Sequence, residues 1–156
     1  MMKIALASDH GGFALKEALK KHLAQRGFAV TDLGAFSDAP ADYPLYGRRC
    51  AEAVAAKEAD RGIVCCGSGI GISIAANKVQ GIRCALCTST RMAELARRHN
   101  DANMLALGGR ILDTQEAIAI TDVWLDTAFE DEQRADGRHR HRVDALNAMS
   151  CGGAIQ

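Results

Sequence analysis

A thiol and a glycine-rich loop lie next to each other in the middle of the chain. Residues 62–78 read GIVCCGSGIGISIAANK, so an apolar run ends at Cys66 and is followed by glycines at positions 67, 69 and 71. This order predicts that Cys66 ends a strand and precedes a helix, where unpaired amides and the helix dipole favour a thiolate and can hold an anion. Glycine lets such amides approach a ligand closely. The segment indicates a base or nucleophile beside an anion-binding site.

Three arginines are candidates for binding a phosphate. Arg138 and Arg142 are four residues apart, which places them on one face of a helix, and Arg110 follows an apolar run. Guanidinium groups bind phosphate through forked, charge-assisted hydrogen bonds. For the tail alone, a solvated basic face or a weak nucleic-acid patch explains the charges equally well.

Two histidines and a tyrosine are weaker candidates. His10 follows the first apolar run, where a lone histidine more often hydrogen-bonds within its loop. His99 stands at the end of an expected helix, a position at which histidine commonly interacts with the helix dipole. Tyr43 has an ordinary role as well, because a buried hydroxyl there usually completes a hydrogen-bond network.

Apolar runs alternate with helical patterns along the chain. We expect strands at residues 3–7, 29–33, 63–66, 84–87 and 104–107, and helices at 13–25, 45–59, 71–78, 90–99 and 114–125. This alternation predicts an α/β fold with five parallel strands in a doubly wound sheet. Ligands bind beyond the carboxyl ends of such strands, and polar clusters recur at those positions.

The last thirty residues have a different character. Within a single domain spanning 1–156, we expect a core over 1–126, followed over 127–156 by an acidic loop and a helix that begins with basic residues. The sheet is complete before this helix begins. We therefore expect the C-terminal helix to pack on a partner subunit.

Charge and cysteine content exclude several classes of protein. The formal net charge is zero, so nothing draws the whole chain to nucleic acid or to an anionic membrane. No apolar run reaches the ~20 residues needed to cross a bilayer, and the amino terminus is too short for a signal peptide, which predicts a cytoplasmic location. The six cysteines are expected to be core residues, including the Cys84–Cys87 pair within an apolar run.

The glycine loop matches neither of two common nucleotide-binding motifs. Gly-x4-Gly-Lys-Ser/Thr is absent, and the spacing is not Gly-x-Gly-x-x-Gly followed by an acidic residue. By spacing alone, a nucleotide-binding module stays open but is weakly supported.

Six segments, in this order, resemble the type B ribose-5-phosphate isomerases, whose superfamily includes the galactose-6-phosphate isomerase subunits. They are residues 8–13 (SDHGGF), 42–44 (DYP), 66–78 (CGSGIGISIAANK), 81–83 (GIR), 98–103 (RHNDAN) and 138–143 (RHRHRV). The likeness runs from Lys3 to about Met149. It implies a Rossmann-like three-layer αβα sandwich, homodimers or dimers of dimers with active sites shared across the interface, and no metal or other cofactor.

The resemblance also implies a reaction and a role for each candidate. A proton would move between C1 and C2 of an aldose phosphate through a cis-enediolate, with Cys66 as the base and His99 opening the sugar ring. The enediolate and sugar hydroxyls would contact Asp9, Tyr43, Gly67, Ser68, Gly69, Gly71 and Asn100. The phosphate would be held by His10, Arg110, Arg138 and Arg142. His99, Asn100, Arg138 and Arg142 would come from the neighbouring subunit.

Some alternatives remain open at this point. Relatives that use a carboxylate base carry it further along the loop, but residues 70–75 contain no acid, which favours the cysteine form. The chain carries thiol, histidine and arginines together, which favours a homodimer, and its acidic stretch 126–136 is longer than the resemblance leads us to expect. The substrate could instead be a tetrose, allose or galactose phosphate. A non-catalytic phosphate- or nucleotide-binding module is less well supported, and an RNA-binding role for the tail least.

Overall fold

The computed structural model describes residues 1–130 and 136–150. Residues 131–135 of the acidic stretch expected at 126–136 lie outside the described residues, as do Cys151 and the rest of the C-terminal tail. No helix in the described part of the chain is long and apolar enough to cross a membrane.

Five parallel strands form one sheet in the order β2-β1-β3-β5-β4. The strands are β1 (Lys3–Ser8), β2 (Ala29–Asp32), β3 (Arg61–Cys66), β4 (Cys84–Leu86) and β5 (Met104–Gly108). A short 3₁₀ helix, η1 (His10–Gly12), follows β1. The α-helices are α1 (Phe13–Gln25), α2 (Tyr43–Ala55), α3 (Ile70–Asn77), α4 (Thr90–Asn100), α5 (Thr114–Asp126) and α6 (Arg138–Ser150). The predicted five-stranded parallel α/β fold is confirmed.

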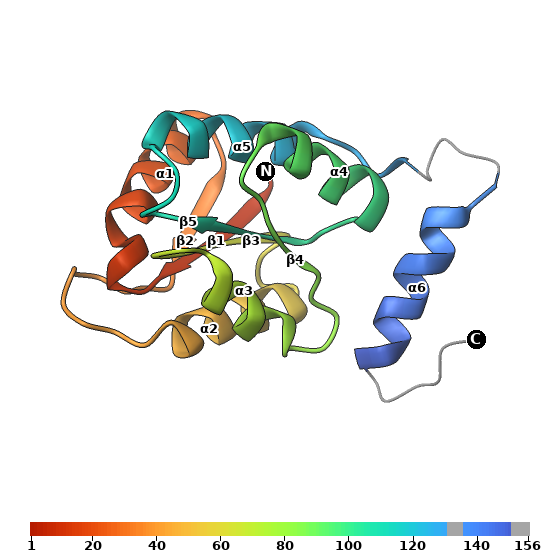
Figure 1. Cartoon of the computed structure of the whole chain (residues 1–156), viewed down its shortest axis with the longest axis horizontal. Coiled ribbons are helices and arrows are strands. Elements are labelled where there is room, and N and C mark those ends of the chain that lie inside the picture. Colours follow the sequence, from red (N-terminus) through yellow and green to blue (C-terminus); the bar gives the residue numbers. More distant parts are fainter. Residues whose placement is uncertain (131–135, 151–156) are drawn as a thin grey trace.

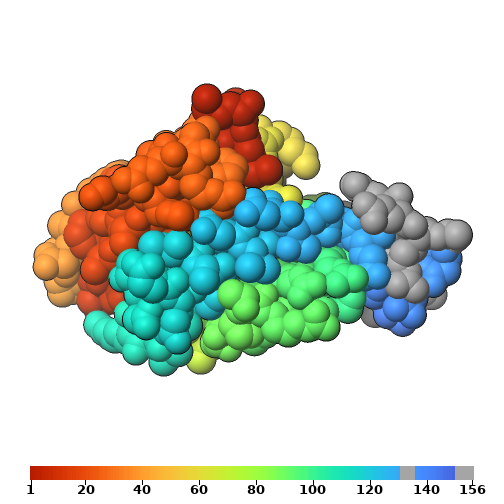
Figure 2. Space-filling view, turned by 90° about the horizontal axis from the view of Figure 1, so that it is seen from above, coloured from red at the N-terminus to blue at the C-terminus, as the bar shows by residue number. Residues whose placement is uncertain are grey.

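Helices cover both faces of the sheet and make three layers (Figure 1). Helices α1, α4 and α5 pack on one face, and Figure 2 shows these three helices side by side when that face is viewed from above. Helices α2 and α3 pack on the other face. Because side chains alternate across a strand, Cys65 enters the core under α1, α4 and α5, while its neighbour Cys66 faces the side of α2 and α3.

The boundaries of the second helix differ from the prediction. The sequence pattern suggested residues 45–59, but α2 starts two residues earlier, with Pro44 in its first turn, and ends at Ala55. Proline is well suited to that first turn. At the other end Lys57 has φ 63°, a left-handed conformation that ends the helix. As a result Tyr43 is the first residue of a helix rather than part of a loop.

A buried ion pair joins α1 to the end of β2. The Lys16 side chain is fully buried, and its Nζ lies 2.7 Å from the Asp32 carboxylate and 2.9 Å from that of Glu17. Asp32 also accepts a hydrogen bond from the Gly34 amide. The Asp32 carboxylate, at the end of β2, thus binds both Lys16 of α1 and the Gly34 amide. The ion pair therefore fixes the start of the loop that leads to α2.

Helix α6 stands beside the three-layer core rather than within it (Figure 1). Helix α6 contacts the core mainly through α4. One direct tie is the hydrogen bond from Arg83 Nη1 to Asn147 Oδ1, at 2.8 Å. Within one chain, α6 therefore packs against the side of the core, where Val143 is buried, and covers neither face of the sheet.

Candidate active site

A pocket of about 370 Å³ lies at the carboxyl ends of β1, β3 and β5. Cys66 ends β3 and pairs in register with Gly108, the last residue of β5. The pocket is lined by Asp9, Tyr43, Cys66, Gly67, Ser68, Gly71, Arg110 and Ile111. The structure thus brings together seven of the residues that the sequence singled out, from four separate segments, at the edge where parallel sheets bind ligands.

Cys66 is held at the pocket wall by the glycine loop. Its side chain is 4% exposed, and its Sγ accepts a hydrogen bond from the Gly69 amide at 3.1 Å. Gly69 precedes the first turn of α3 and has φ 78°, which glycine adopts without strain. An amide donor and the amino end of a helix therefore both face the sulfur, an arrangement that stabilises negative charge on it.

The loop amides are not all available to a ligand. The Gly69 amide points at the Cys66 sulfur and the Ile70 amide donates to Ser68 Oγ at 3.2 Å, which differs from the expectation that both would face the substrate. None of the hydrogen bonds found among the described residues uses the amides of Gly67 and Ser68. These two amides are available to bind an oxyanion in the pocket, as is the Gly71 amide in the first turn of α3.

The other cysteines that the structure describes are unreactive near neutral pH. Burial raises the pKa of the Cys50 thiol to about 12 and that of Cys87 to about 11. It raises the pKa values of Cys65 and Cys84 further still. These four thiols stay protonated near neutral pH, and only a thiolate is a strong base or nucleophile. Cys50, Cys65 and Cys87 are buried, Cys84 is partly exposed, and all four are free thiols, which fits the predicted packing role.

Three polar side chains line the same pocket as the sulfur. Asp9 is 7% exposed and accepts a hydrogen bond from the Gly12 amide at 3.0 Å, which fixes its carboxylate at the end of β1. The Tyr43 ring lies against Gly71, where an added Cβ would come within 2.6 Å of the Tyr43 Cζ. Arg110 covers Gly67, where an added Cβ would lie 3.2 Å from Nη1. The glycines at 67 and 71 thus make room for an arginine and an aromatic ring.

His10 stands next to this pocket without lining it. Its Nδ1 lies 3.1 Å from the amide nitrogen of Ala41 and 3.2 Å from the carbonyl oxygen of the same residue. In this chain His10 therefore contacts the loop before α2, which is the ordinary hydrogen-bonding role that the sequence suggested, and the residue is exposed.

The remaining candidates lie at the opposite end of the strands from the Cys66 pocket. Helix α4 runs antiparallel to the strands, so its last turn, with His99 and Asn100, returns to the edge where strands begin. Arg83, just before β4, donates to the Asn100 carbonyl oxygen at 3.1 Å. A rise of about 3.3 Å per residue makes β3 about 16 Å long. Cys66 and His99 of one chain are therefore too far apart to contact one sugar.

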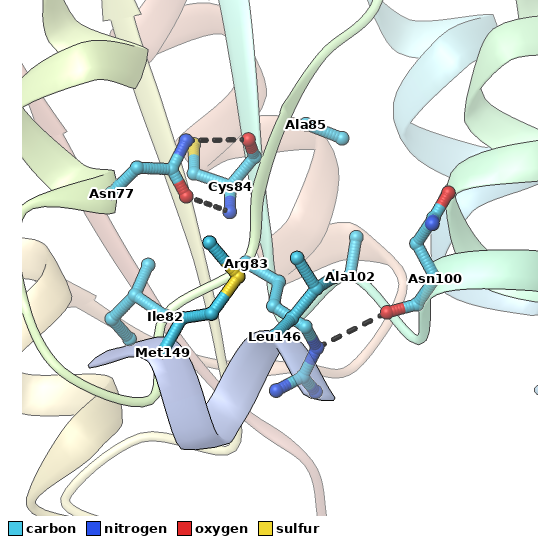
Figure 3. Close-up of a pocket in the computed structure, with 9 residues that line it drawn as sticks. All are labelled: Asn77, Ile82, Arg83, Cys84, Ala85, Asn100, Ala102, Leu146 and Met149. Carbon is cyan, nitrogen blue, oxygen red and sulfur yellow. Dashed lines mark hydrogen bonds between the residues drawn. The ribbon is translucent and has the colours of Figure 1, made fainter. Parts of the chain in front are cut away.

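Asn100 lines a second pocket of about 420 Å³ (Figure 3). It is lined by Leu146 and Met149 of α6 and, from the core, by Ile82 and Cys84 among others. The exposed Arg138 and Arg142 lie on the same helix, α6. His99, Asn100 and the two arginines therefore form a group around α4 and α6, separate from the Cys66 pocket.

His99 has an environment of its own. Its Nε2 lies 3.3 Å from Glu130 Oε2, and its ring stacks on that of His139 with centroids 4.4 Å apart. Burial and the nearby His139 lower the pKa of His99, although Glu130 opposes this shift. The imidazole is consequently mostly neutral at pH 7 and can exchange protons with a ligand.

Sequence reasoning assigned no role to three residues near these groups. Ile111 forms part of the Cys66 pocket, and Glu130 and His139 contact His99. Ile111 follows Arg110 at the end of β5, so its position beyond a strand was a usable signal. Glu130 and His139 lie 31 and 40 residues after His99, and nothing in the sequence pattern links them to it.

Comparison with known proteins gives a consistent result. The sequence model of the Ribose/Galactose Isomerase family matches residues 4–146. The chain is 46% identical to ribose-5-phosphate isomerase B of Escherichia coli over 149 residues, which cover 96% of this chain and 97% of that protein.

Solved structures agree with this chain in fold over nearly its full length. A ribose-5-phosphate isomerase B from Clostridium thermocellum has a TM-score of 0.92 and 48% identity, covering 97% of this chain and 99% of the other. A ribose-5-phosphate isomerase B from Mycoplasma genitalium with bound ribulose-5-phosphate has a TM-score of 0.88 and 39% identity, covering 96% and 97% of the two chains.

Proposed function

Because the chain belongs to the ribose/galactose isomerase family, we propose that it interconverts ribose 5-phosphate and ribulose 5-phosphate. The observation that carries this function is Cys66, whose sulfur lies on the wall of a polar pocket and accepts the Gly69 amide hydrogen bond. An aldose–ketose isomerase needs a base in such a position, next to donors that stabilise an enediolate.

The reaction is a proton transfer with no net oxidation. The Cys66 thiolate removes the proton from C2 of the open-chain aldose, and the electrons form the C1–C2 double bond of an enediolate. Return of a proton to C1, with transfer of the O2 hydroxyl proton to O1, gives the ketose. The amides of Gly67 and Ser68 stabilise the charge that develops on the enediolate oxygens.

Other residues of the same pocket orient the substrate. The buried Asp9 carboxylate and the Tyr43 hydroxyl are suited to bind sugar hydroxyl groups. Arg110 is exposed at the mouth of the pocket and forms no ion pair among the described residues, which leaves its guanidinium available for the phosphate. The exposed His10 lies beside it as a second phosphate contact.

A second copy of the chain completes the site. Four of the candidates lie far from Cys66 within one chain, around α4 and α6: His99, Asn100, Arg138 and Arg142. In this proposal they serve the active site of a partner subunit. Exposed apolar side chains on α2 and α3 support an interface close to the Cys66 pocket: Leu45, Ile70 and Ile74 are 48%, 54% and 55% exposed. The functional unit is then a homodimer or a dimer of dimers.

Turnover of a panel of sugar phosphates tests this function. Purified protein without added metal is incubated with ribose 5-phosphate and with tetrose, allose and galactose phosphates, and ketose formation is measured. Ribose 5-phosphate should react fastest and should exchange its C2 hydrogen with solvent deuterium. Faster turnover of another sugar would change the substrate and keep the chemistry, whereas no exchange with any of them would reject the isomerase.

A further inference from the structure

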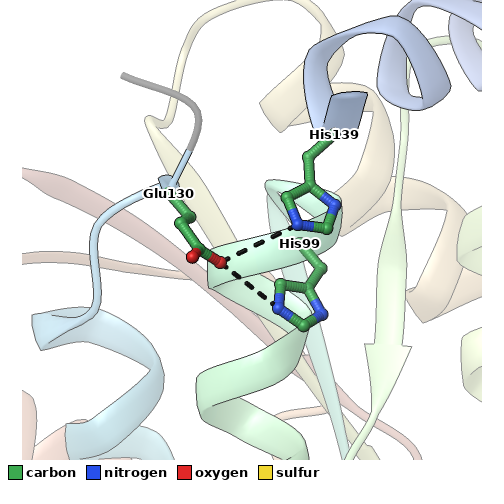
Figure 4. Close-up of side chains that lie close together, drawn as sticks. All are labelled: His99, Glu130 and His139. Atoms are coloured by element: carbon green, nitrogen blue, oxygen red, sulfur yellow. Dashed lines mark ion pairs between the residues drawn. The ribbon is translucent and has the colours of Figure 1, made fainter. Parts of the chain in front are cut away.

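Two histidines and a carboxylate meet where α4, α6 and the segment after α5 come together (Figure 4). His99 Nε2 and His139 Nε2 lie 3.3 and 3.8 Å from the same oxygen, Glu130 Oε2. The imidazole rings are nearly parallel, with an angle of 10° between their planes, and Figure 4 shows both turning a nitrogen toward Glu130. The three side chains therefore present two nitrogens and one oxygen to one small volume.

One of these donor atoms is buried without a hydrogen bond. The His139 side chain is 5% exposed, and its Nε2 has no hydrogen-bond partner in the part of the chain that the structure describes. The 3.8 Å to Glu130 Oε2 is too long for a hydrogen bond. A buried polar atom without a partner is unfavourable, and it points to a ligand that would satisfy it.

The donor atoms lie close enough together to share one small metal ion once the two stacked imidazole rings turn toward it. All three lie within 4.8 Å of one another. Bonds of about 2.0–2.1 Å to nitrogen and oxygen in a tetrahedron place ligand atoms about 3.3 Å apart. His99 Nε2 lies at this distance, 3.3 Å, from Glu130 Oε2, and His139 Nε2 lies 3.8 Å from the same oxygen. Imidazole nitrogens select Zn²⁺, Co²⁺, Ni²⁺ or Cu²⁺ over Mg²⁺ and Ca²⁺.

We propose that His99, Glu130 and His139 bind a divalent transition-metal ion such as Zn²⁺ and that this ion inhibits the enzyme. His99 is 39% exposed, so the site is open to solvent on one side. Arg98, which lies 3.4 Å from Glu130, keeps its 2.8 Å ion pair with Glu94 when the Glu130 carboxylate turns to a metal. The fourth position of the ion is left for water.

Inhibition follows from the function proposed above and rests on it. In that function His99 exchanges a proton with the sugar during ring opening. A metal on its Nε2 occupies the lone pair that this transfer requires. The bound ion therefore blocks the proton transfer of ring opening and lowers the turnover rate.

A binding measurement tests the site without reference to activity. The full chain, freed of metal by a chelator, is titrated with Co²⁺ followed by visible absorption, and with Zn²⁺ by calorimetry. The wild type should bind one ion per chain at this site, and Glu130→Gln and His139→Gln should each weaken binding by at least about tenfold. His141→Gln alters an exposed histidine on the same helix and is the matched control, which should bind as the wild type does.

A second measurement separates the site from the function. Each protein's turnover of ribose 5-phosphate is compared with and without Zn²⁺, relative to its own metal-free rate. Wild type and His141→Gln should be inhibited and recover with chelator, while Glu130→Gln and His139→Gln should resist. Equal binding in all four proteins would overturn the metal site, and equal inhibition in all four would overturn inhibition through that site. A wild type that binds Co²⁺ at these residues but turns over no sugar without metal would reject the function and keep the site.

Discussion

The amide of Gly69 donates a hydrogen bond to the sulfur of Cys66, at 3.1 Å. The donor is three residues beyond the acceptor and reaches back because Gly69 has a left-handed conformation before α3 begins. This bond fixes the sulfur at the pocket wall and offsets negative charge on it. The base proposed for the isomerisation is therefore positioned by its own loop.

Replacing this sulfur should abolish most of the activity. Cys66→Ala removes the base, and loss of general base catalysis typically lowers the rate by about 10²–10⁴-fold. We expect kcat for ribose 5-phosphate to fall by that amount. Cys65→Ala is the matched control, because its thiol is adjacent in sequence but fully buried on the opposite face of the sheet. Similar kcat values for the two variants would exclude Cys66 as the base.

Two inactive variants should restore each other if active sites are shared. Cys66→Ala and His99→Asn are co-expressed with different tags, and the mixed dimer is purified by both tags. Each mixed dimer has one site with both residues intact, so we expect about half the wild-type activity per dimer. The control is each variant purified alone. An inactive mixed dimer would place Cys66 and His99 in the same subunit's site or in none.

A methyl group at Gly71 should disturb substrate binding through Tyr43. The added Cβ would lie 2.6–2.9 Å from three atoms of the Tyr43 ring, which is 40% exposed and free to move aside. Gly71→Ala should therefore raise KM several-fold while the protein stays folded. In a Tyr43→Ala background the same change should have little further effect, as a double-mutant cycle would show. Additive effects of the two substitutions would contradict this coupling.

The buried Lys16–Asp32 pair should contribute stability that depends on pH. Although burial alone would raise the pKa of Asp32, hydrogen bonds from Lys16 and Lys20 lower it overall, below the ordinary value of 3.8. The stabilisation is therefore present above about pH 4 and is lost as the pH falls through the lower, folded-state pKa. Asp32→Asn leaves the Lys16 ammonium buried without its main partner, which costs about 3 kcal/mol at neutral pH.

Urea unfolding between pH 3 and 7 measures this effect. The difference in unfolding free energy between wild type and Asp32→Asn should be largest near neutrality and shrink below about pH 4. Glu17→Gln serves as the control, because the Glu17 side chain is 38% exposed and its ion pairs are screened by water. A difference for Asp32→Asn that stays constant with pH would show that the charge of Asp32 is not what stabilises the fold.

The sequence by itself determined the local chemistry of this protein. Alternating apolar runs and helical patterns indicated the parallel α/β sheet, and the order thiol, glycine loop, helix placed Cys66 at a strand end. These features are local, because hydrogen bonding and φ angles within a few residues decide them. The start of α2 was less well determined, because the pattern placed it at residue 45 and did not show that Tyr43 would start the helix.

Only the tertiary structure decided which distant residues meet. The sheet order puts β5 between β3 and β4, and a regular alternation of strands and helices is compatible with other orders. The return of α4 across the sheet carries His99 away from Cys66. Packing of α6 brings His139 to it, and the segment after α5 brings Glu130. Contacts between residues far apart in sequence depend on how whole elements pack, and no local pattern encodes that packing.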